Sequence, residues 1–346
     1  MTWDGVVELA ERRGGAYALL ATRGDQVLLE RYRGCRPDSL FFAFSVTKPF
    51  TAMAIHLLAE RGQLSLDDPV AHHWPAYVAH GKDAITIRHV LEHRAGVPSS
   101  ARFLLVDLAA MPFRGVSVWL AQRARPRWPA GQEAAYHVVS FGFILAEVVR
   151  RVDGRRIEQF LSEEIFAPLG LDAYLALPSA ELKRTVRLHG IGGNLITPTF
   201  VNRRLGRRAV IPAASLHITA RSLAAFFRLL AGGGVDQAGR RLCAPQTLAA
   251  ALAGPTEGCW DHLLGEAQRY GLGFQLGGLP GLVRGIGTRS DPAAFGHNGS
   301  SVCNVWADPS RDAVFVYLTG TCPRVMPGVR AMAAMSDAAL GAFDAG

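Results

Sequence analysis

The sequence predicts an α/β (α+β) fold, in which an antiparallel sheet is flanked by helices and completed by both ends of the chain. Two observations predict it. Runs rich in branched and aromatic residues occur near the start and the end of the 346 residues, whereas the middle repeats apolar residues at helical spacing. We therefore expect an α/β domain from residues 1–70 and 213–346, a mainly helical domain from residues 71–212, and an active site in the cleft between them.

The first expected elements lie close together at the start of the chain. Residues 2–13 have the spacing of a short helix, and residues 16–22 and 26–32 read as two strands. The Arg-Gly-Asp between these strands is typical of a hairpin turn. A long apolar helix should then begin at Ser45 and end near Gly62, because glycine readily takes the left-handed conformation that terminates helices.

The remaining elements follow from the same patterns. Residues 101–175 are mostly helical in spacing, and residues 176–212 are irregular, with several glycines and prolines. Further helices are expected at residues 86–92 (Thr86 as N-cap), 140–151, 157–166, 219–230 (Thr219 as N-cap), 244–252 and 327–343. Further strands are expected at residues 271–276, 302–307 and 313–318.

Composition excludes several classes of protein. The formal net charge is +8, and the densest basic cluster combines Arg203-Arg204 with Arg207-Arg208, but no nucleic-acid-binding module accompanies it. A solvated basic surface is the simplest interpretation, and attraction of an acidic substrate or partner is the alternative.

The five cysteines are odd in number and form no C-x-x-C, so neither disulfides nor a metal site are expected, and no cofactor motif is present. Without a signal-peptide pattern or a long apolar span, we expect a cytoplasmic protein with no membrane partner.

A candidate nucleophile lies at the start of the long apolar helix. Ser45 and Lys48 are three residues apart, so they share one face of a helix. A serine hydroxyl needs an adjacent base, and a lysine can be that base if its pKa is lowered. The chain has 37 basic residues but only three lysines, and an arginine could not take this role because it does not lose its proton. By itself, S-x-x-K also occurs often by chance.

Two later segments could join this pair. Tyr136-His137-Val138 lies just before a predicted helix, and a tyrosine beside a lysine can relay a proton. Gly296-His297-Asn298-Gly299-Ser300 precedes a predicted strand, and the backbone N–H groups of Ser45 and Ser300 could together bind an oxyanion. A buried tyrosine and an ordinary Asn-Gly hairpin turn are the competing interpretations.

In combination and order, these segments resemble the class C β-lactamase-like serine hydrolases, which include penicillin-binding peptidases and carboxylesterases. The segments 62–70, 90–98, 128–136 and 168–171 also resemble blocks of this family, so the likeness covers nearly the whole chain. The resemblance implies the serine β-lactamase and penicillin-binding-protein fold. It also implies that Ser45 is the acylated nucleophile, Lys48 its base and Tyr136 part of the proton relay.

Two departures from the β-lactamase pattern narrow the expected substrate. Val138 replaces the asparagine that holds a substrate amide, and His297 replaces the lysine of Lys-Thr-Gly. Both are similar to esterase-type members. We expect His137, Val138, His297, Asn298 and Gly299 to contact substrate.

The expected activity is that of a carboxylesterase on a small-molecule ester or acyl donor. An acyltransferase, a β-lactamase or D-amino-acid amidase, and a non-catalytic binding protein are the alternatives. His56 and His93 are expected to be structural. Substrate specificity should depend on the loops near residues 101–115, 176–212 and 255–295. The sequence does not predict the oligomeric state.

Overall fold

The structure is a computed structural model that describes residues 2–100, 104–194, 196–236, 238–254, 258–279 and 285–345. Parts of the three loops that should set specificity, at residues 101–103, 195, 255–257 and 280–284, therefore lie outside the described residues. None of the helices in the described ranges is long and apolar enough to cross a membrane.

A six-stranded antiparallel sheet forms one side of the molecule, with the order β2-β1-β12-β11-β10-β9. Its strands are β1 (Tyr17–Arg23), β2 (Gln26–Arg33), β9 (Gln275–Leu276), β10 (Phe295–Gly299), β11 (Cys303–Asp308) and β12 (Ala313–Thr319). The first strand of the chain pairs with the last long one along their full length, so that Tyr17 faces Thr319. The predicted sheet completed by both chain ends is confirmed.

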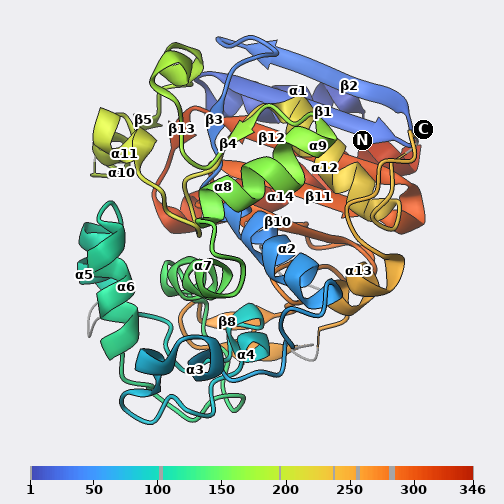
Figure 1. Ribbon diagram of the computed structural model, residues 1–346. Helices are drawn as coiled ribbons and strands as arrows, with labels where there is room; N and C mark the ends of the chain where they lie inside the picture. Colours follow the sequence, from blue (N-terminus) through green and yellow to red (C-terminus); the bar gives the residue numbers. More distant parts are fainter. Residues whose placement is uncertain are drawn as a thin grey trace.

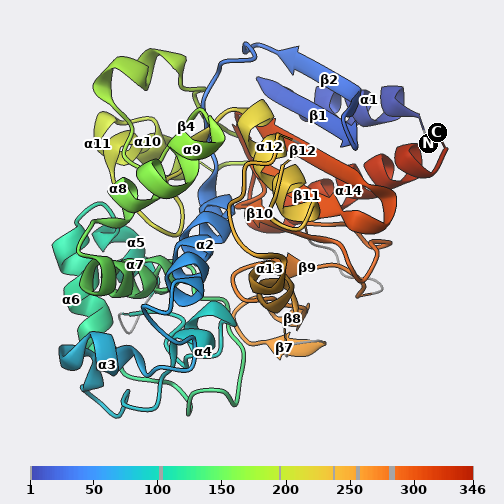
Figure 2. The ribbon, with the colours of Figure 1, turned by 45° about the vertical axis from the view of Figure 1, so that its right-hand side comes forward.

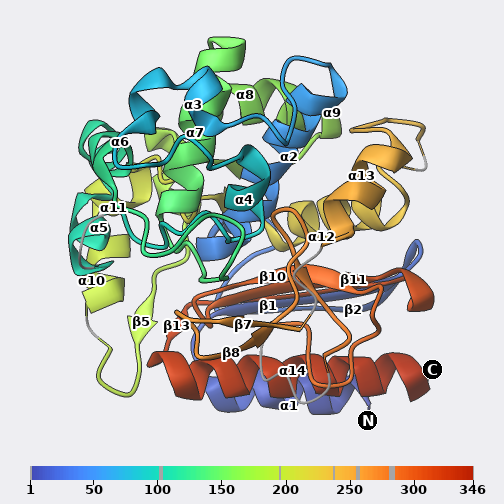
Figure 3. The same cartoon turned by 90° about the horizontal axis from the view of Figure 1, so that it is seen from below.

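Helices cover both faces of this sheet because its strands alternate buried side chains between the two sides. Tyr17, Leu19 and Ala21 belong to the cluster under α1 (Trp3–Arg13) and α14 (Val325–Ala345), whereas Ala18 and Leu20 belong to the main core. Figure 3 shows α1 and α14 side by side along one face of the sheet. The helix α12 (Ala220–Ala231) packs on the opposite face.

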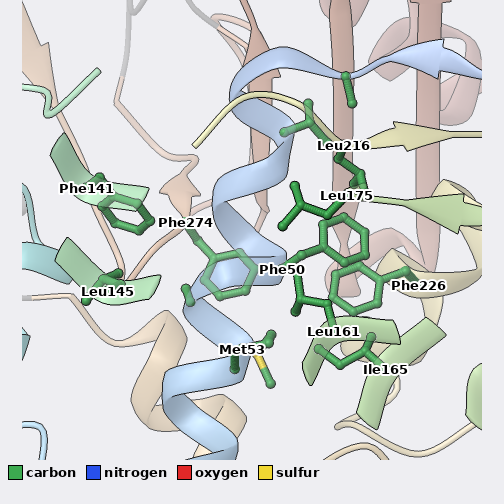
Figure 4. Packing of buried hydrophobic residues seen from close by; sticks show 14 of the residues in the cluster. Phe50, Met53, Phe141, Leu145, Leu161, Ile165, Leu175, Leu216, Phe226 and Phe274 are labelled. Atoms are coloured by element: carbon green, nitrogen blue, oxygen red, sulfur yellow. The ribbon is translucent and has the colours of Figure 1, made fainter. Parts of the chain in front are cut away.

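The helix α2 (Thr47–Glu60) runs through the centre of the molecule, and its first twelve residues are buried (Figure 2). A helix that is apolar on every side needs neighbours on every side. Phe141 and Leu145 of α7 (Ser140–Asp153) approach it from one direction, and Phe226 of α12 stacks on Phe50 from another, with ring centroids 4.0 Å apart (Figure 4). The position of residues 45–48 is therefore fixed by the main hydrophobic core.

The remaining elements surround this helix, and α3 and α5–α8 lie on the other side of it from the sheet (Figure 2). They are α3 (Val70–His73), α4 (Ile87–Leu91), α5 (Leu104–Ala110), α6 (Arg114–Arg123), α8 (Ile157–Leu161), α9 (Ala167–Leu169), α10 (Ile196–Val201), α11 (Arg204–Arg208) and α13 (Pro245–Leu252). The short strands are β3 (Phe41–Phe42), β4 (Ala173–Tyr174), β5 (His189–Gly190), β6 (His217–Ile218), β7 (Cys259–Asp261), β8 (Glu266–Gln268) and β13 (Thr321–Cys322).

Three predictions about these elements need correction. The strand expected over residues 271–276 is reduced to Gln275–Leu276, because the backbone of the preceding residues turns to meet Ala251 and Leu91. The irregular segment 176–212 contains the short helices α10 and α11. The Asn298-Gly299 pair lies inside β10, and the hairpin turns at the next two residues instead.

Candidate active site

Ser45 lies in a single 3-10 turn, η1 (Phe44–Val46), that leads directly into α2. The chain from Leu40 to Phe50 is buried except for Ser45, which is partly exposed. Phe44 has a positive φ of 48°, a conformation that side chains other than glycine adopt at a cost of about 1–2 kcal/mol. The strained residue directly before Ser45 turns its hydroxyl out of an otherwise buried segment.

Lys48 is fully buried, and its Nζ lies 3.3 Å from the Oγ of Ser45. Nζ also donates to the carbonyl oxygens of Val138, at 2.9 Å, and Ala213, at 3.3 Å. No carboxylate of a described residue pairs with it, and burial lowers its pKa well below the usual value. In its neutral form this amine has two N–H bonds and one lone pair. When the two carbonyls accept those N–H groups, the lone pair is left for the Ser45 hydroxyl.

Tyr136 lies against this lysine: Nζ of Lys48 is 4.6 Å from the centre of its ring. The loop that carries the tyrosine is held by His93. The backbone N–H of His137 donates to Nδ1 of His93, and the N–H of Ala135 donates to the His93 carbonyl. The rings of His93 and Tyr136 are 4.6 Å apart. Since Nδ1 of His93 accepts a hydrogen bond, that histidine is neutral, and burial lowers its pKa well below the usual value.

The structure brings the third predicted segment to the same place. The ring of His297, on β10, lies 6.1 Å from the ring of Tyr136. Its Nδ1 donates to the carbonyl of Asn298 at 2.7 Å, and burial, with the nearby Lys48, lowers its pKa to about 3. A methyl group at Gly299 would overlap the carbonyl oxygen of Ala43 and lie 3.0 Å from Cβ of Phe44. The end of β10 therefore packs directly on the segment before Ser45, and only glycine permits this approach.

Beyond Gly299, the hairpin turns through Ser300 and Ser301, whose φ values are 49° and 59°. Two successive positive φ values define a type I′ turn, which matches the twist of the flanking strands. Ser300 is exposed at the tip of this turn, and Arg13 of α1 donates from its Nη2 to the carbonyl of Ser301. The turn is thus fixed by a helix from the other end of the chain.

The other predicted contact residues differ in how accessible they are. Val138 is half-buried, and Asn298 is partly exposed, with its backbone N–H and Nδ2 donating to Oε1 of Gln275. His137 is completely buried, its Nδ1 donates to the carbonyl of Ala135, and burial lowers its pKa to about 4. Its Nε2 has no partner among the described residues.

Sequence reasoning missed three residues that shape the site: Arg13, Ala213 and Gln275. His93 was expected to be structural, and the structure shows that it holds the loop of Tyr136. Backbone conformation marks the site as well: of the six non-glycine residues with positive φ in the described part of the chain, four border it, namely Phe44, His93, Ser300 and Ser301. Such strain gathers at functional sites.

This fold and this arrangement of Ser45, Lys48 and Tyr136 define the serine hydrolases of the β-lactamase and penicillin-binding-protein type. The chain belongs to the Beta-lactamase family, whose sequence profile matches residues 6–339. It is 28% identical to "Esterase/beta-lactamase LipL" of Mycobacterium tuberculosis, over 88% of this chain and 76% of that protein. Among solved structures, a penicillin-binding protein homologue from Caulobacter crescentus is 28% identical, with a TM-score of 0.81 and 97% of both chains covered. A family VIII carboxylesterase, 24% identical, superposes with a TM-score of 0.83 over 97% of this chain and 96% of that chain.

Proposed function

We propose that this protein is a carboxylesterase that hydrolyses small-molecule esters through an acyl-enzyme on Ser45. The observation that carries the proposal is the position of Lys48. Its buried Nζ lies 3.3 Å from the Ser45 hydroxyl, and two backbone carbonyls hold it in place. A base held in this way can take the serine proton as the bond to substrate forms.

The proposed reaction has two halves. Lys48 takes the proton of Ser45, whose Oγ bonds to the ester carbonyl carbon, while the N–H groups of Ser45 and Ser300 bind the oxyanion. The C–O bond to the alcohol then breaks, and the alcohol leaves with the proton, delivered through Lys48 and Tyr136. In the second half a water molecule gives up a proton to the same groups and attacks the acyl carbon. The acid leaves and Ser45 regains its hydrogen.

Electrostatics and hydrogen bonding favour esters over lactams and peptides. His297 occupies the place of a β-lactamase lysine, but with a pKa of about 3 it is neutral and offers no positive charge to a substrate carboxylate. Val138 has no side-chain amide to bind an acylamino group. The relative from Mycobacterium tuberculosis is named both an esterase and a β-lactamase, so it supports ester hydrolysis but does not separate esters from lactams.

The test is a Ser45→Ala variant assayed on p-nitrophenyl acetate and butyrate and labelled with a fluorophosphonate probe. Loss of both turnover and labelling is expected. Ser300→Ala is a matched control, because it removes a hydroxyl near the same site but keeps the backbone N–H, and it should retain activity within about fivefold. Wild-type turnover by Ser45→Ala would overturn the proposal.

The same acyl-enzyme could pass its acyl group to an alcohol or amine in place of water. Product analysis with added acceptors separates the two reactions, because a transferase forms a new ester or amide faster than free acid. Rapid turnover of a chromogenic cephalosporin would instead support a β-lactamase.

A further inference from the structure

A basic hollow on the outer side of the molecule takes no part in the proposed chemistry. It has a volume of about 460 Å³ and lies between α6, the start of α8 and α11. Its lining contains four arginines and one carboxylate: Arg114, Arg156, Arg204, Arg208 and Glu158. The arginine-rich segment that composition alone left unexplained forms part of its wall.

Several N–H donors of the arginines around this hollow have no carboxylate partner among the described residues. Nη1 of Arg114 pairs with Glu158 at 3.1 Å, but its buried Nη2 has no hydrogen-bond partner among the described residues. Arg156, Arg204 and Arg208 are exposed, and none pairs with a carboxylate of the described chain. The hollow thus presents several guanidinium groups that a single carboxylate does not neutralise.

Other arginines of this chain are paired much more fully. Arg155 and Arg184 each contact three carboxylates. The scarcity of carboxylate partners around the hollow is therefore not shared by every arginine of this protein. Guanidinium groups that converge on one space suit an oxyanion, above all a phosphate, which accepts two hydrogen bonds from each planar fork.

An apolar hollow of about 410 Å³ adjoins the basic one, and Leu205 lines both. Ile196, Thr199, Phe200 and Arg203 form the rest of its lining. Ile196 is 85% exposed and Leu205 54% exposed. Large apolar side chains exposed together next to unpaired cations are typical of a surface that contacts a charged amphiphile.

The helices around the two hollows share one edge of the molecule. Figures 1 and 3 both place α5, α6, α10 and α11 along the same side. Phe113, directly before α6, is 53% exposed, and Trp119 within α6 is 51% exposed. The apolar and basic groups therefore lie on elements that could meet one extended surface.

We propose that the two hollows bind an anionic phospholipid at a lipid surface, with the phosphate in the basic hollow and part of an acyl chain in the apolar one. Complementary charge and the shared wall at Leu205 argue for this single occupant. The proposal departs from the expectation of no membrane partner, which rested on the absence of a spanning segment. Binding at a lipid surface needs no such segment.

The test is co-sedimentation of the full chain with vesicles of phosphatidylcholine alone or mixed with phosphatidylglycerol. The wild type should bind the anionic vesicles at least about tenfold more strongly, and added salt should weaken binding. The double change Arg204→Ala with Arg208→Ala should remove most of this preference, and Leu205→Ala should weaken binding severalfold. The matched control changes Arg31 and Arg33 of β2 to alanine, which removes the same charge elsewhere and should alter binding less than about twofold.

Three outcomes would overturn the proposal. The first is equal binding to both kinds of vesicle. The second is an equal loss in the two double variants, which would indicate attraction by net charge alone. The third is calorimetric binding of butyl phosphate or inorganic phosphate without vesicle binding, which would make the ligand a soluble anion. Each readout is independent of ester hydrolysis, so its failure would leave the proposed function untouched.

Discussion

At the scale of single residues, the site depends on a buried lysine whose surroundings favour its neutral form. Lys48 has carbonyl partners but no carboxylate partner among the described residues. A carboxylate would stabilise the ammonium form and raise the pKa, whereas carbonyl oxygens leave desolvation as the dominant effect. The surroundings of Nζ therefore favour a base rather than a fixed positive charge.

Lys48→Arg should lower kcat/KM by at least about 100-fold, because guanidinium cannot accept the serine proton. Lys48→Ala should do the same, because a charged and an uncharged replacement both remove the base. Steady-state assays, with thermal unfolding as a folding control, would measure the effect. Activity of Lys48→Arg within tenfold of wild type would exclude the base role.

The activity should decrease at acidic pH, because protonation of Lys48 removes the base. Lys48 acts when neutral, and its lowered pKa means that it stays neutral well below the pH at which an exposed lysine becomes protonated. Activity should be full above the pKa of Lys48 and fall as the pH drops through it. A kcat/KM profile on a soluble ester measures this acid limb. A profile that rises with acid would contradict the assignment.

The Gly299→Ala change tests the contact between β10 and the nucleophile segment. The added methyl would overlap the Ala43 carbonyl, so the strand must shift away from Ser45 and the oxyanion donors with it. We expect kcat to fall by roughly 100-fold. Gly115→Ala on α6 is the control, because its methyl would meet nothing within 4 Å and should leave kcat unchanged.

The grouping of Ser45, Lys48 and Tyr136 could be predicted from residue types and order, but the environment of these side chains could not. His297 is neutral because it is buried, and His93 holds the loop of Tyr136 through contacts between distant segments. The spacing of residues in the sequence encodes neither effect.

At the scale of elements, the helices and long strands could be predicted because their periodicity extends over many residues. The shortest strands could not, since two residues carry no period: β5 and β13 exist because distant segments meet. The hairpin after β10 shows a different limit. Asn298-Gly299 is a strong turn signal, but Gly299 is needed inside the strand for its close approach to Ala43, and the serines that follow take the strained turn positions.

The contact from α1 to this turn can be tested with Arg13→Met, which keeps the apolar stem and removes the donors. Without the bond to the Ser301 carbonyl, the turn that carries Ser300 should loosen. We expect kcat to fall about tenfold with a smaller change in KM, because oxyanion binding matters most in the transition state.

The neighbouring Arg12 offers a control on the same helix. It is exposed, and Glu8, at 3.6 Å, is its one ion-pair partner among the described residues. Arg12→Met should therefore leave kcat within twofold of wild type, or about 0.4 kcal/mol. Equal effects of the two changes would mean that α1, rather than this hydrogen bond, is responsible.

At the scale of the whole molecule, buried histidines link folding to pH. Burial lowers the pKa to about 4 for His56, His137 and His217 and to about 3 for His297. In the unfolded chain each should titrate near 6.5. The unfolded state therefore binds more protons below that pH, and stability that is complete above about pH 6.5 is lost as the pH falls toward 4.

Each of these histidines should contribute a slope of up to about 1.4 kcal/mol per pH unit to the free energy of unfolding in this window. Urea unfolding at several pH values would measure the total slope. His56→Gln should reduce this slope by up to about 1.4 kcal/mol per pH unit, which corresponds to one proton. A stability that is constant between pH 6.5 and 5 would contradict the expectation.

The pairing of β1 with β12 also has a consequence during synthesis. Tyr17 on β1 pairs with Thr319 on β12, which is synthesised roughly 300 residues later, so this edge of β1 stays unpaired until then. At about 5–20 residues per second, a ribosome leaves the early strands with one open edge for at least several seconds. The turn that bears Ser300 is also translated late, so the oxyanion site proposed here cannot exist on a nascent chain. The proposed ester hydrolysis would therefore need all residues up to the end of β12 to be made first, and a messenger truncated before β12 should yield an aggregation-prone product without activity.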